Sequence, residues 1–273
     1  RKCAAASAWP PPPPPPPPPL LPLPQKAGTE DRFAYDSYRR FLEMFSEIAL
    51  DVDPAFFASV RDEVLSLTGF RSVEQLTAEW HNNLARAYEN ALEQAAVWLP
   101  EDPRSQLRLA IIGVFRSWNT PRAVRFRRAN NIPDDLGTAV TIQSMVFGNL
   151  DGASATGVAF SRDPNTGEPG LFGEYLPQAQ GEDVVSGRFT PRPIFGGEHC
   201  LSNIAPDASS ELVRISELLE THHRSVQDLE FTVERGKLWM LQTRSAKCSV
   251  RASVRIAVDM VQEGLIGREE ALR

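Results

Sequence analysis

Apolar side chains between residues 31 and 120 recur every three or four positions, the spacing of the buried face of an amphipathic helix. Asp53 followed by Pro54 is typical of a helix start, with Asp53 as the N-cap and Pro54 in the first turn. The pattern predicts helices over residues 31–48, from Asp53 onward, over 72–98 either continuous or interrupted, and over 103–118. Residues 31–120 are therefore expected to form a helical subdomain, with Arg39, Arg40 and Arg61 on its solvated faces.

Between residues 121 and 245 the apolar spacing shortens to every second residue, the period of a half-buried strand. Mostly antiparallel strands, with helices packed to one side, make an α+β fold. One helix is predicted over residues 209–223, with Ser209 as its N-cap and an apolar face of Leu212, Ile215, Leu218 and Leu219. Strands are predicted over residues 123–128, 138–147, 157–161, 171–175 and, as a hairpin, 228–244.

Residues 246–273 are expected to form an exit helix that leads out of the sheet-forming part. Its apolar residues are numerous enough to predict a broad apolar face. These residues are Val250, Val254, Ile256, Val258, Met260 and Val261.

The hairpin at residues 228–244 carries the most informative polar pattern of the chain. Glu234, Arg235 and Gly236 suit a three-residue loop, in which Gly236 adopts the left-handed conformation as a bulge. That loop would pair Glu230 with Met240, and Asp228 with Gln242. A two-residue loop would shift the pairing by one position and divide the polar side chains between the two faces of the sheet.

In the expected register, Asp228, Glu230, Gln242 and Arg244 share one sheet face, with Phe231, Val233, Trp239 and Leu241 behind it. Carboxylate and amide oxygens are ligands that suit Mg²⁺, and a guanidinium fork suits phosphate. The pattern therefore indicates a site for a magnesium-bound phosphate compound. The alternative is a solvated strand face with a single ion pair.

Composition places the chain among globular proteins and argues against several other classes. Hydrophobic residues make up 42% of the 273 residues and charged residues 23%, with a net charge of −6. The negative charge gives no support for nucleic-acid binding, and the apolar runs are shorter than a membrane span. Three scattered cysteines without metal-ligand spacing favour a reducing compartment, such as the cytoplasm, and no structural zinc.

Residues 1–30 form a proline-rich segment that is expected to be disordered. The unbroken run from Pro10 to Pro19 favours polyproline II, which suits a ligand of an SH3 or WW type module, a tether, or a translated stretch that is not part of the domain. The segment lacks the apolar core of a signal peptide. Arg1, Lys2 and the small residues after them leave open the tail of a plastid transit peptide.

Several motifs occur in the order in which one protein family carries them. They lie at residues 32–41, 130–134, 137–140, 143–149, 155–161, 173–175, 179–187 and 228–244. Together they resemble the ATP-binding domain of pyruvate, phosphate dikinase, and the resemblance runs from about residue 32 to residue 273. It implies an ATP-grasp fold, with residues 121–245 as the nucleotide-binding lobe. The family transfers a phosphoryl group from ATP to a histidine on a separate domain, which then phosphorylates pyruvate to phosphoenolpyruvate.

The resemblance also implies roles for individual residues. Backbone groups of residues 143–146, including Gln143, Met145 and Val146, would contact adenine. Glu182 and Asp183 would lie on the ribose or metal side. Asp228, Glu230 and Gln242 would form the essential set that holds Mg²⁺ and positions the phosphates, and Arg244 would contact phosphate. The implied partners are ATP and the phosphohistidine and pyruvate-binding domains of a full-length enzyme that is a homodimer.

The chain departs from the family in what it lacks. The family's phosphate-holding Lys and Arg and its glycine-rich loop precede the segment at residues 32–41, where this chain has the proline run. No phosphohistidine motif or pyruvate-binding domain is present. These departures predict an enzyme fragment that alone neither turns over nor binds ATP tightly. The alternative is a non-catalytic remnant or truncated gene product with a polyproline interaction arm.

Overall fold

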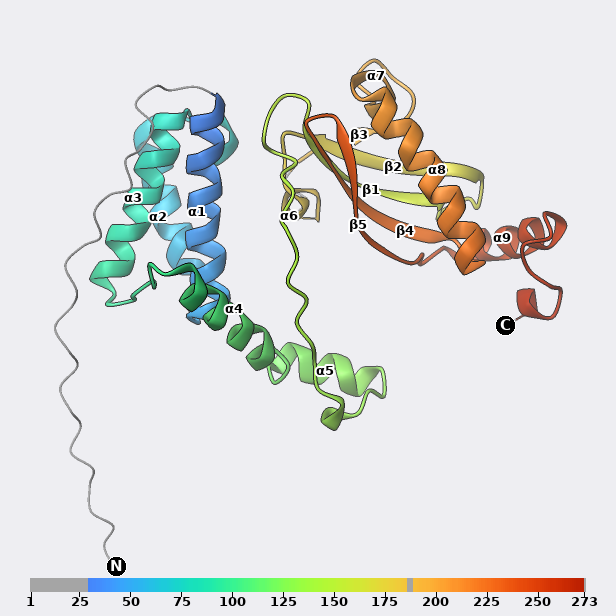
Figure 1. The fold of residues 1–273 in the computed structure, drawn as a ribbon, viewed down its shortest axis with the longest axis horizontal. Helices are drawn as coiled ribbons and strands as arrows, with labels where there is room; N and C mark the ends of the chain where they lie inside the picture. The colour runs from blue at the N-terminus through green and yellow to red at the C-terminus, as the bar shows by residue number, and fades with distance from the viewer. Residues whose placement is uncertain (1–28, 186–188, 273) are drawn as a thin grey trace, which may run out of the picture. The chain divides into compact units, whose positions relative to one another are not determined.

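The structure is a computed structural model that describes residues 29–185 and 189–272 of the 273-residue chain. The described chain divides into two compact units, one made mainly of residues 35–140 and the other mainly of residues from 141 onward (Figure 1). The division lies about 20 residues beyond the expected end of the helical subdomain at residue 120. The disorder and polyproline II conformation expected near the N-terminus fall on residues 1–28, outside the described residues.

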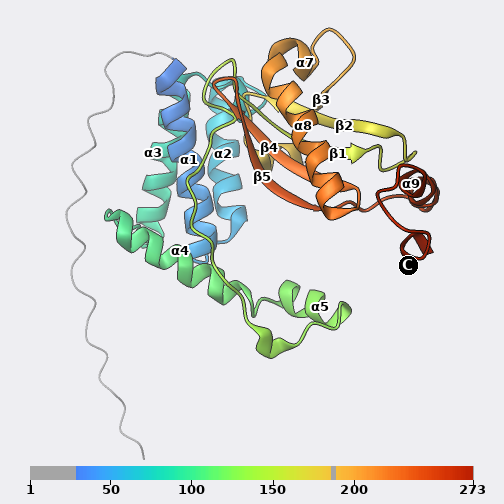
Figure 2. The ribbon, with the colours of Figure 1, turned by 45° about the vertical axis from the view of Figure 1, so that its right-hand side comes forward.

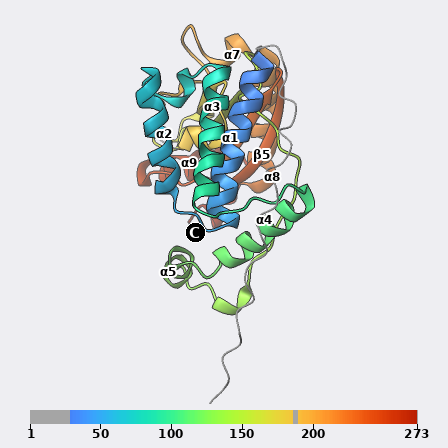
Figure 3. The ribbon, with the colours of Figure 1, turned by 90° about the vertical axis from the view of Figure 1, so that its left-hand side faces the viewer.

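The first unit is helical. Helices α1 (Thr29–Ala49), α2 (Pro54–Thr68) and α3 (Ala78–Gln94) lie side by side (Figure 3) and bury a shared core that includes Leu42, Phe57, Leu84, Tyr88 and Leu92. Helix α4 (Pro103–Ser117), helix α5 (Pro121–Ala129) and the short turns η1 (Val73–Gln75) and η2 (Asp134–Leu136) complete the unit. Asp53 caps α2 as predicted, because its Oδ1 accepts a hydrogen bond from Ala55 N at 2.9 Å.

Residues 123–128 were predicted as a strand but lie in helix α5 (Pro121–Ala129). Thr120 Oγ1 accepts a hydrogen bond from Ala123 N at 3.3 Å, and Pro121 occupies the first helical position. These two start signals outweigh the short alternation of apolar residues and arginines. Arg127 then fixes the end of the helix, with its guanidinium carbon 4.0 Å from the Trp118 ring centre and Nη2 2.7 Å from Asp134.

The second unit is built on a sheet of five strands in the order β3-β2-β1-β4-β5, in which every neighbouring pair is antiparallel (Figure 2). The α+β fold expected from the sequence is confirmed. The strands are β1 (Ala155–Arg162), β2 (Pro169–Pro177), β3 (Arg192–Pro193), β4 (Gln227–Glu234) and β5 (Lys237–Ser245). The short helices α6 (Gly181–Val185) and α7 (Leu201–Ile204) lie between strands in the sequence.

Helix α8 (Pro206–His223) covers one face of the sheet. Its residues Ala208 and Leu212 pack against Leu229, Phe231 and Val233, all of them buried. The helix begins at Pro206, not at the predicted N-cap Ser209, which is buried within the helix. Proline is preorganised for the first helical turn, so the helix extends back to it. Leu218, expected on the apolar face, is exposed.

Residues 138–147 were also predicted as a strand, but in the described structure they are not part of the sheet. Their β-branched side chains favour extended backbone, yet a strand also needs a neighbour that completes its hydrogen bonds. The described sheet ends at β3 and β5, and neither edge pairs with this segment.

Helix α9 (Val250–Gln262) occupies part of the expected exit helix, but its apolar face is narrower than predicted. Ala252, Ile256 and Met260 are buried, whereas Val250, Val254 and Val258 are exposed. No helix in the described ranges is long and apolar enough to cross a membrane.

A buried arginine ties α9 to the sheet and to α8. Arg162, at the end of β1, contacts Glu220 of α8 with Nη2 at 2.7 Å and Nε at 3.0 Å. Its Nη1 lies 3.0 Å from Glu263, directly after α9. The hydrogen bond from Arg162 holds the pKa of Glu263 below its usual range. This pairing satisfies charges that would otherwise be costly to bury.

Candidate functional site

The β4–β5 hairpin closes through a two-residue turn, not the three-residue loop expected from the sequence. Arg235 and Gly236 both have left-handed backbone, with φ of 50° and 79°. Positive φ at both central positions is characteristic of a type I′ turn, whose twist matches that of the flanking strands. Two hydrogen bonds hold the turn: Arg235 N donates to Ser154 Oγ and Gly236 N donates to Ala153 O, each at 3.1 Å.

A bulge in β5 then compensates for the shorter turn. Next to the turn, Phe231 pairs with Met240, but the register shifts between Glu230 and Phe231. Leu241 is the extra residue, so that Glu230 lies opposite Gln242 and Asp228 opposite Arg244. The predicted pairs, Glu230 with Met240 and Asp228 with Gln242, are wrong.

The four polar residues nevertheless lie on one face of the sheet, because the turn and the bulge each shift the pairing by one residue, and a total shift of two returns the side chains to the same face. Directly opposed residues project from the same face, and residues two apart along a strand do so as well. This places Asp228, Glu230, Gln242 and Arg244 together, on the face opposite to α8. We call it the open face.

The residues behind the open face differ from those expected. Leu238 and Met240 pack against the core with Phe231 and Val233, whereas Trp239 and Leu241 do not. Trp239 pairs with Thr232 on the open face and keeps 38% of its surface exposed. The shift of register by the two-residue turn accounts for this exchange.

Arg244 links the two carboxylates of the open face. Its Nε lies 2.8 Å from Asp228 Oδ2, and its Nη2 lies 3.6 Å from Glu230 Oε1. The hydrogen bond to Asp228 raises the pKa of Arg244 above its ordinary value. The Arg244 side chain is 57% exposed and that of Glu230 is 35% exposed, so both remain accessible to a ligand.

The donor chemistry of the open face fits Mg²⁺. Asp228 and Glu230 offer carboxylate oxygens and Gln242 offers an amide oxygen, the hard ligands that this ion prefers. Within the described ranges, no group of three or more His, Cys, Asp or Glu residues is arranged to hold a metal ion. A magnesium ion here would therefore depend on two carboxylates, the amide of Gln242 and oxygens of its ligand.

The segment expected to contact adenine is extended and joined to β4 at one end. Gln143 and Met145 are exposed, Val146 is half-buried, and the backbone of residues 141–146 forms no hydrogen bond within its described unit. At the end of the segment, Phe147 N donates to Glu234 Oε1 at 2.8 Å. The sequence did not predict this contact, because no local motif links residues that are 87 positions apart.

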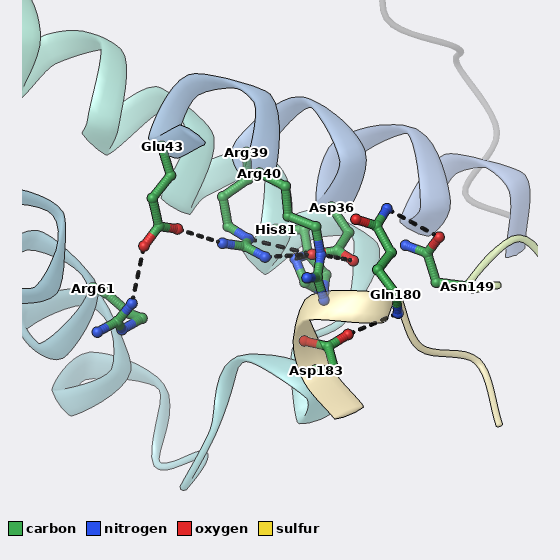
Figure 4. A network of polar contacts seen from close by, with 9 residues as sticks. All are labelled: Asp36, Arg39, Arg40, Glu43, Arg61, His81, Asn149, Gln180 and Asp183. Carbon is green, nitrogen blue, oxygen red and sulfur yellow. Dashed lines mark hydrogen bonds and ion pairs between the residues drawn. The ribbon is translucent and has the colours of Figure 1, made fainter. Parts of the chain in front are cut away.

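Glu182 and Asp183 lie in helix α6, outside the hairpin. Asp183 Oδ2 accepts a hydrogen bond from Gln180 N at 2.9 Å, which is the backbone half of a capping box (Figure 4). Glu182 is exposed. Gln180 Nε2 also donates to Asn149 Oδ1 at 3.2 Å, and both of these side chains belong to buried residues. Asp183 therefore has a structural role in capping α6.

The helical unit contains a second group of arginines and carboxylates, also drawn in Figure 4. Arg39 and Arg40 were expected to be solvated, but both pair with the buried Asp36, at 2.8 and 3.1 Å. Arg39 and Arg61 also share Glu43, at 2.9 and 3.2 Å. Burial alone would raise the pKa of Asp36, but the neighbouring cations, Arg39 first among them, hold it well below its usual range.

Comparison with known proteins decides the family. The chain matches the family described as "Pyruvate phosphate dikinase, AMP/ATP-binding domain" over residues 46–199 and 196–265. The chain belongs to this family. Its α+β fold, with an antiparallel sheet and flanking helices, agrees with the ATP-grasp-like architecture expected for the family.

Individual relatives agree with this assignment. Pyruvate, phosphate dikinase of Rhizobium meliloti (strain 1021) is 47% identical over 251 residues, which cover 88% of this chain and 28% of that protein. The protein of the same name from Clostridium symbiosum is 46% identical over 243 residues, or 88% of this chain and 27% of that protein. Pyruvate, phosphate dikinase 2 of Zea mays is 44% identical over 252 residues, or 92% and 28%. The chain thus spans little more than a quarter of the length of these relatives.

Proposed function

We propose that this chain binds the magnesium complex of ATP on the open face and contributes to phosphoryl transfer from ATP to a histidine on another domain. The observation that carries the proposal is the placement of Asp228, Glu230, Gln242 and Arg244 on one accessible face by the bulge at Leu241. A face of this composition matches the two charges of the ligand, a cation and a polyanion.

The side chains of the open face would bind different parts of the ligand, according to their charge. Asp228, Glu230 and Gln242 would hold Mg²⁺ through oxygen atoms, and Arg244 would bind phosphate oxygens through its fork of N–H donors. Mg²⁺, when bound, would neutralise charge that develops on the phosphates during transfer. Arg244 compensates the two carboxylates, which reduces the repulsion between their like charges.

The other predicted residues extend the site along the nucleotide. The backbone of residues 143–146, with Gln143, Met145 and Val146, would contact adenine through N–H and C=O groups that form no hydrogen bonds within their described unit. We assign Glu182 and Asp183 to the ribose or metal side, where Asp183 would combine this role with capping α6.

The wider assignment follows the names of the relatives. Proteins named pyruvate, phosphate dikinase are expected to pass the phosphoryl group from the histidine to pyruvate, which forms phosphoenolpyruvate. The partners of this chain would then be ATP, the phosphohistidine domain, the pyruvate-binding domain and a second subunit of a homodimer. For the compartment we propose the cytoplasm, with the plastid as the alternative, because the relative from Flaveria trinervia is named chloroplastic.

A nuclear magnetic resonance titration of the chain with Mg·ATP tests the proposal, since it detects weak as well as tight binding. Amide signals of residues 141–147 and 228–244 should shift together and saturate. The double variant Asp228→Asn and Glu230→Gln should lose these shifts, whereas Glu217→Gln, an exposed glutamate on α8, should keep them. Shifts confined to other parts of the chain, or equal in the double variant, would contradict the proposal.

The alternative function is a non-catalytic product whose polyproline segment binds a partner. That segment lies in residues 1–28, outside the described residues, and no structural observation favours this function over the first.

A further inference from the structure

Glu234 connects the extended segment at residues 141–147 to the strand that carries the acids. Its Oε1 accepts the hydrogen bond from Phe147 N at 2.8 Å. Glu234 follows Glu230 by four residues on β4, and side chains alternate along a strand, so both project from the open face. One side chain therefore joins the segment proposed to contact adenine to the face proposed to contact phosphate.

The two residues that follow Phe147 reinforce this connection. Gly148 packs so closely that a Cβ there would lie 2.7 Å from Ala155 O and closer still to Ala179 O. Asn149 is buried and accepts a hydrogen bond from Gln180 at 3.2 Å. Three consecutive residues, 147–149, are thus held by three different parts of the same unit. We call residues 147–149 the anchor.

The anchor contrasts with the residues before it. The backbone of residues 141–146 makes no hydrogen bond within its described unit, and five of these six residues are exposed. Because the segment is fixed at the anchor, the direction of its last residues depends on the anchor. The hydrogen bond that Phe147 N donates to Glu234 is the only one of the three contacts that involves β4.

We infer that Glu234 is a positioning residue, which holds the backbone of residues 143–146 at a set distance from Glu230 and Asp228. This inference rests on the proposed function of the open face and extends it. Four residues of strand span about 13 Å, so the anchor and Glu230 are separated along β4 much as the base and the phosphates are separated along an extended nucleotide. Glu234 would thus set the distance between the adenine contacts and the phosphate contacts of the protein. It would do so without touching the nucleotide itself.

Two substitutions distinguish the effect of the hydrogen bond to Glu234 from the effect of its charge. Glu234→Ala removes the acceptor for Phe147 N, whereas Glu234→Gln keeps an amide oxygen in the same place. Glu217→Ala, on the exposed side of α8, serves as the matched control. Two ligands distinguish the adenine end of the site from the phosphate end. Mg·ATP would contact both ends. Mg·tripolyphosphate, which lacks a base and a ribose, would contact only the phosphate end.

The experiment combines resonance titrations of the full chain with amide hydrogen exchange. In Glu234→Ala, the affinity for Mg·ATP should fall by about tenfold, the effect of losing one well-placed hydrogen bond. The affinity for Mg·tripolyphosphate should not change, and the Phe147 amide should exchange faster. Glu234→Gln should restore both properties, and Glu217→Ala should match the unsubstituted chain.

The possible outcomes point to different conclusions. Unchanged Mg·ATP affinity in Glu234→Ala would overturn the positioning role. Equal losses for Mg·ATP and Mg·tripolyphosphate would also overturn it, because they would mean that Glu234 supports the whole sheet. If the unsubstituted chain responds to neither ligand, the proposed function fails and the nucleotide role of Glu234 fails with it. Faster exchange at Phe147 would then still identify Glu234 as a structural contact of the anchor.

Discussion

The ion pairs around Asp36 in the helical unit and those around Arg244 on the open face of the sheet differ in their surroundings. In the helical unit, Arg39 is 6% exposed and Asp36 is 5% exposed. On the open face of the sheet, by contrast, more than half of the Arg244 side chain is exposed. Similar residues thus form a buried network around Asp36 and an accessible surface around Arg244.

The difference shows how burial separates structural ion pairs from candidate ligand sites. Asp36 is paired with two arginines and cannot lose them without leaving charges buried. Asp228 and Glu230 are paired with an arginine that water also reaches, so a cation and a phosphate could replace that pairing at low cost. Charge alone, read from the sequence, does not distinguish these situations.

The largest expected effect comes from breaking the buried group. Asp36→Ala leaves Arg39 and Arg40 without their shared carboxylate and should reduce the free energy of unfolding of the helical unit by about 3–5 kcal/mol. Urea unfolding, followed through amide signals of α1 to α3, measures this change. Asp62→Ala, which removes an exposed carboxylate on α2, is the control. Equal effects of the two substitutions would mean that the network does not stabilise the unit.

Acid should weaken the same group. The pKa of Asp36 in the folded protein lies below its ordinary value of 3.8, so its contribution to stability is complete above that value and is lost as the pH falls below it. Unfolding of the helical unit, measured between pH 6 and pH 3, should therefore show a steeper loss for the unsubstituted chain than for Asp36→Asn. Parallel curves would contradict this prediction.

Breaking the accessible group should affect the ligand more than the fold. Arg244→Ala should change the free energy of unfolding by less than about 1 kcal/mol, because exposed ion pairs contribute little. Its affinity for Mg·ATP should fall by about tenfold or more, since a charge-assisted contact to phosphate is lost. Arg214→Ala, an exposed arginine on α8, should leave the affinity unchanged. A stability loss as large as that of Asp36→Ala would remove the distinction between the two groups.

The smallest effect is expected from deletion of Leu241. Without the extra residue, Gln242 directly follows Met240, so Glu230 still pairs with Gln242 and the polar residues stay on the open face. The deletion should therefore preserve the Mg·ATP response of residues 228–244. Insertion of one alanine after Leu241, with the bulge retained, should instead move Gln242 and Arg244 to the α8 face and abolish the response. Equal responses of these two variants would show that the register does not control the site.

The sequence predicted those parts of the fold whose signals are local. The cap at Asp53, the helix at residues 103–117, and the strands around Gly157 and Leu171 all follow from capping residues or apolar spacing. At Thr120 and Pro121 the helix-start signals are also local, and they outweigh the short alternation of apolar residues and arginines that follows. The strand predicted over residues 138–147 is wrong for another reason. Strand pairing depends on a neighbour that is distant in the sequence, and β-propensity does not reveal that neighbour.

The candidate site was only partly accessible from the sequence. The polar pattern identified Asp228, Glu230, Gln242 and Arg244 as residues of one face, but the turn type and the bulge were not predicted. Gly236 is compatible with both a two-residue and a three-residue turn, and only packing against the core decides between them. The contact of Glu234 with Phe147 depends on folding that brings distant segments together, so no local rule could predict it.

The turn at Arg235 has a consequence for the order of folding. A side chain with a Cβ adopts the left-handed conformation at a cost of about 1–2 kcal/mol, so this turn does not form easily by itself. One of its hydrogen bonds is donated by Arg235 N to Ser154 Oγ, 81 residues earlier in the chain. We therefore expect the hairpin to close late, after β1 has reached its place. Substitution of Gly236 by alanine should then accelerate unfolding and leave the folding rate unchanged, and slower folding would show that the hairpin acts as a nucleus.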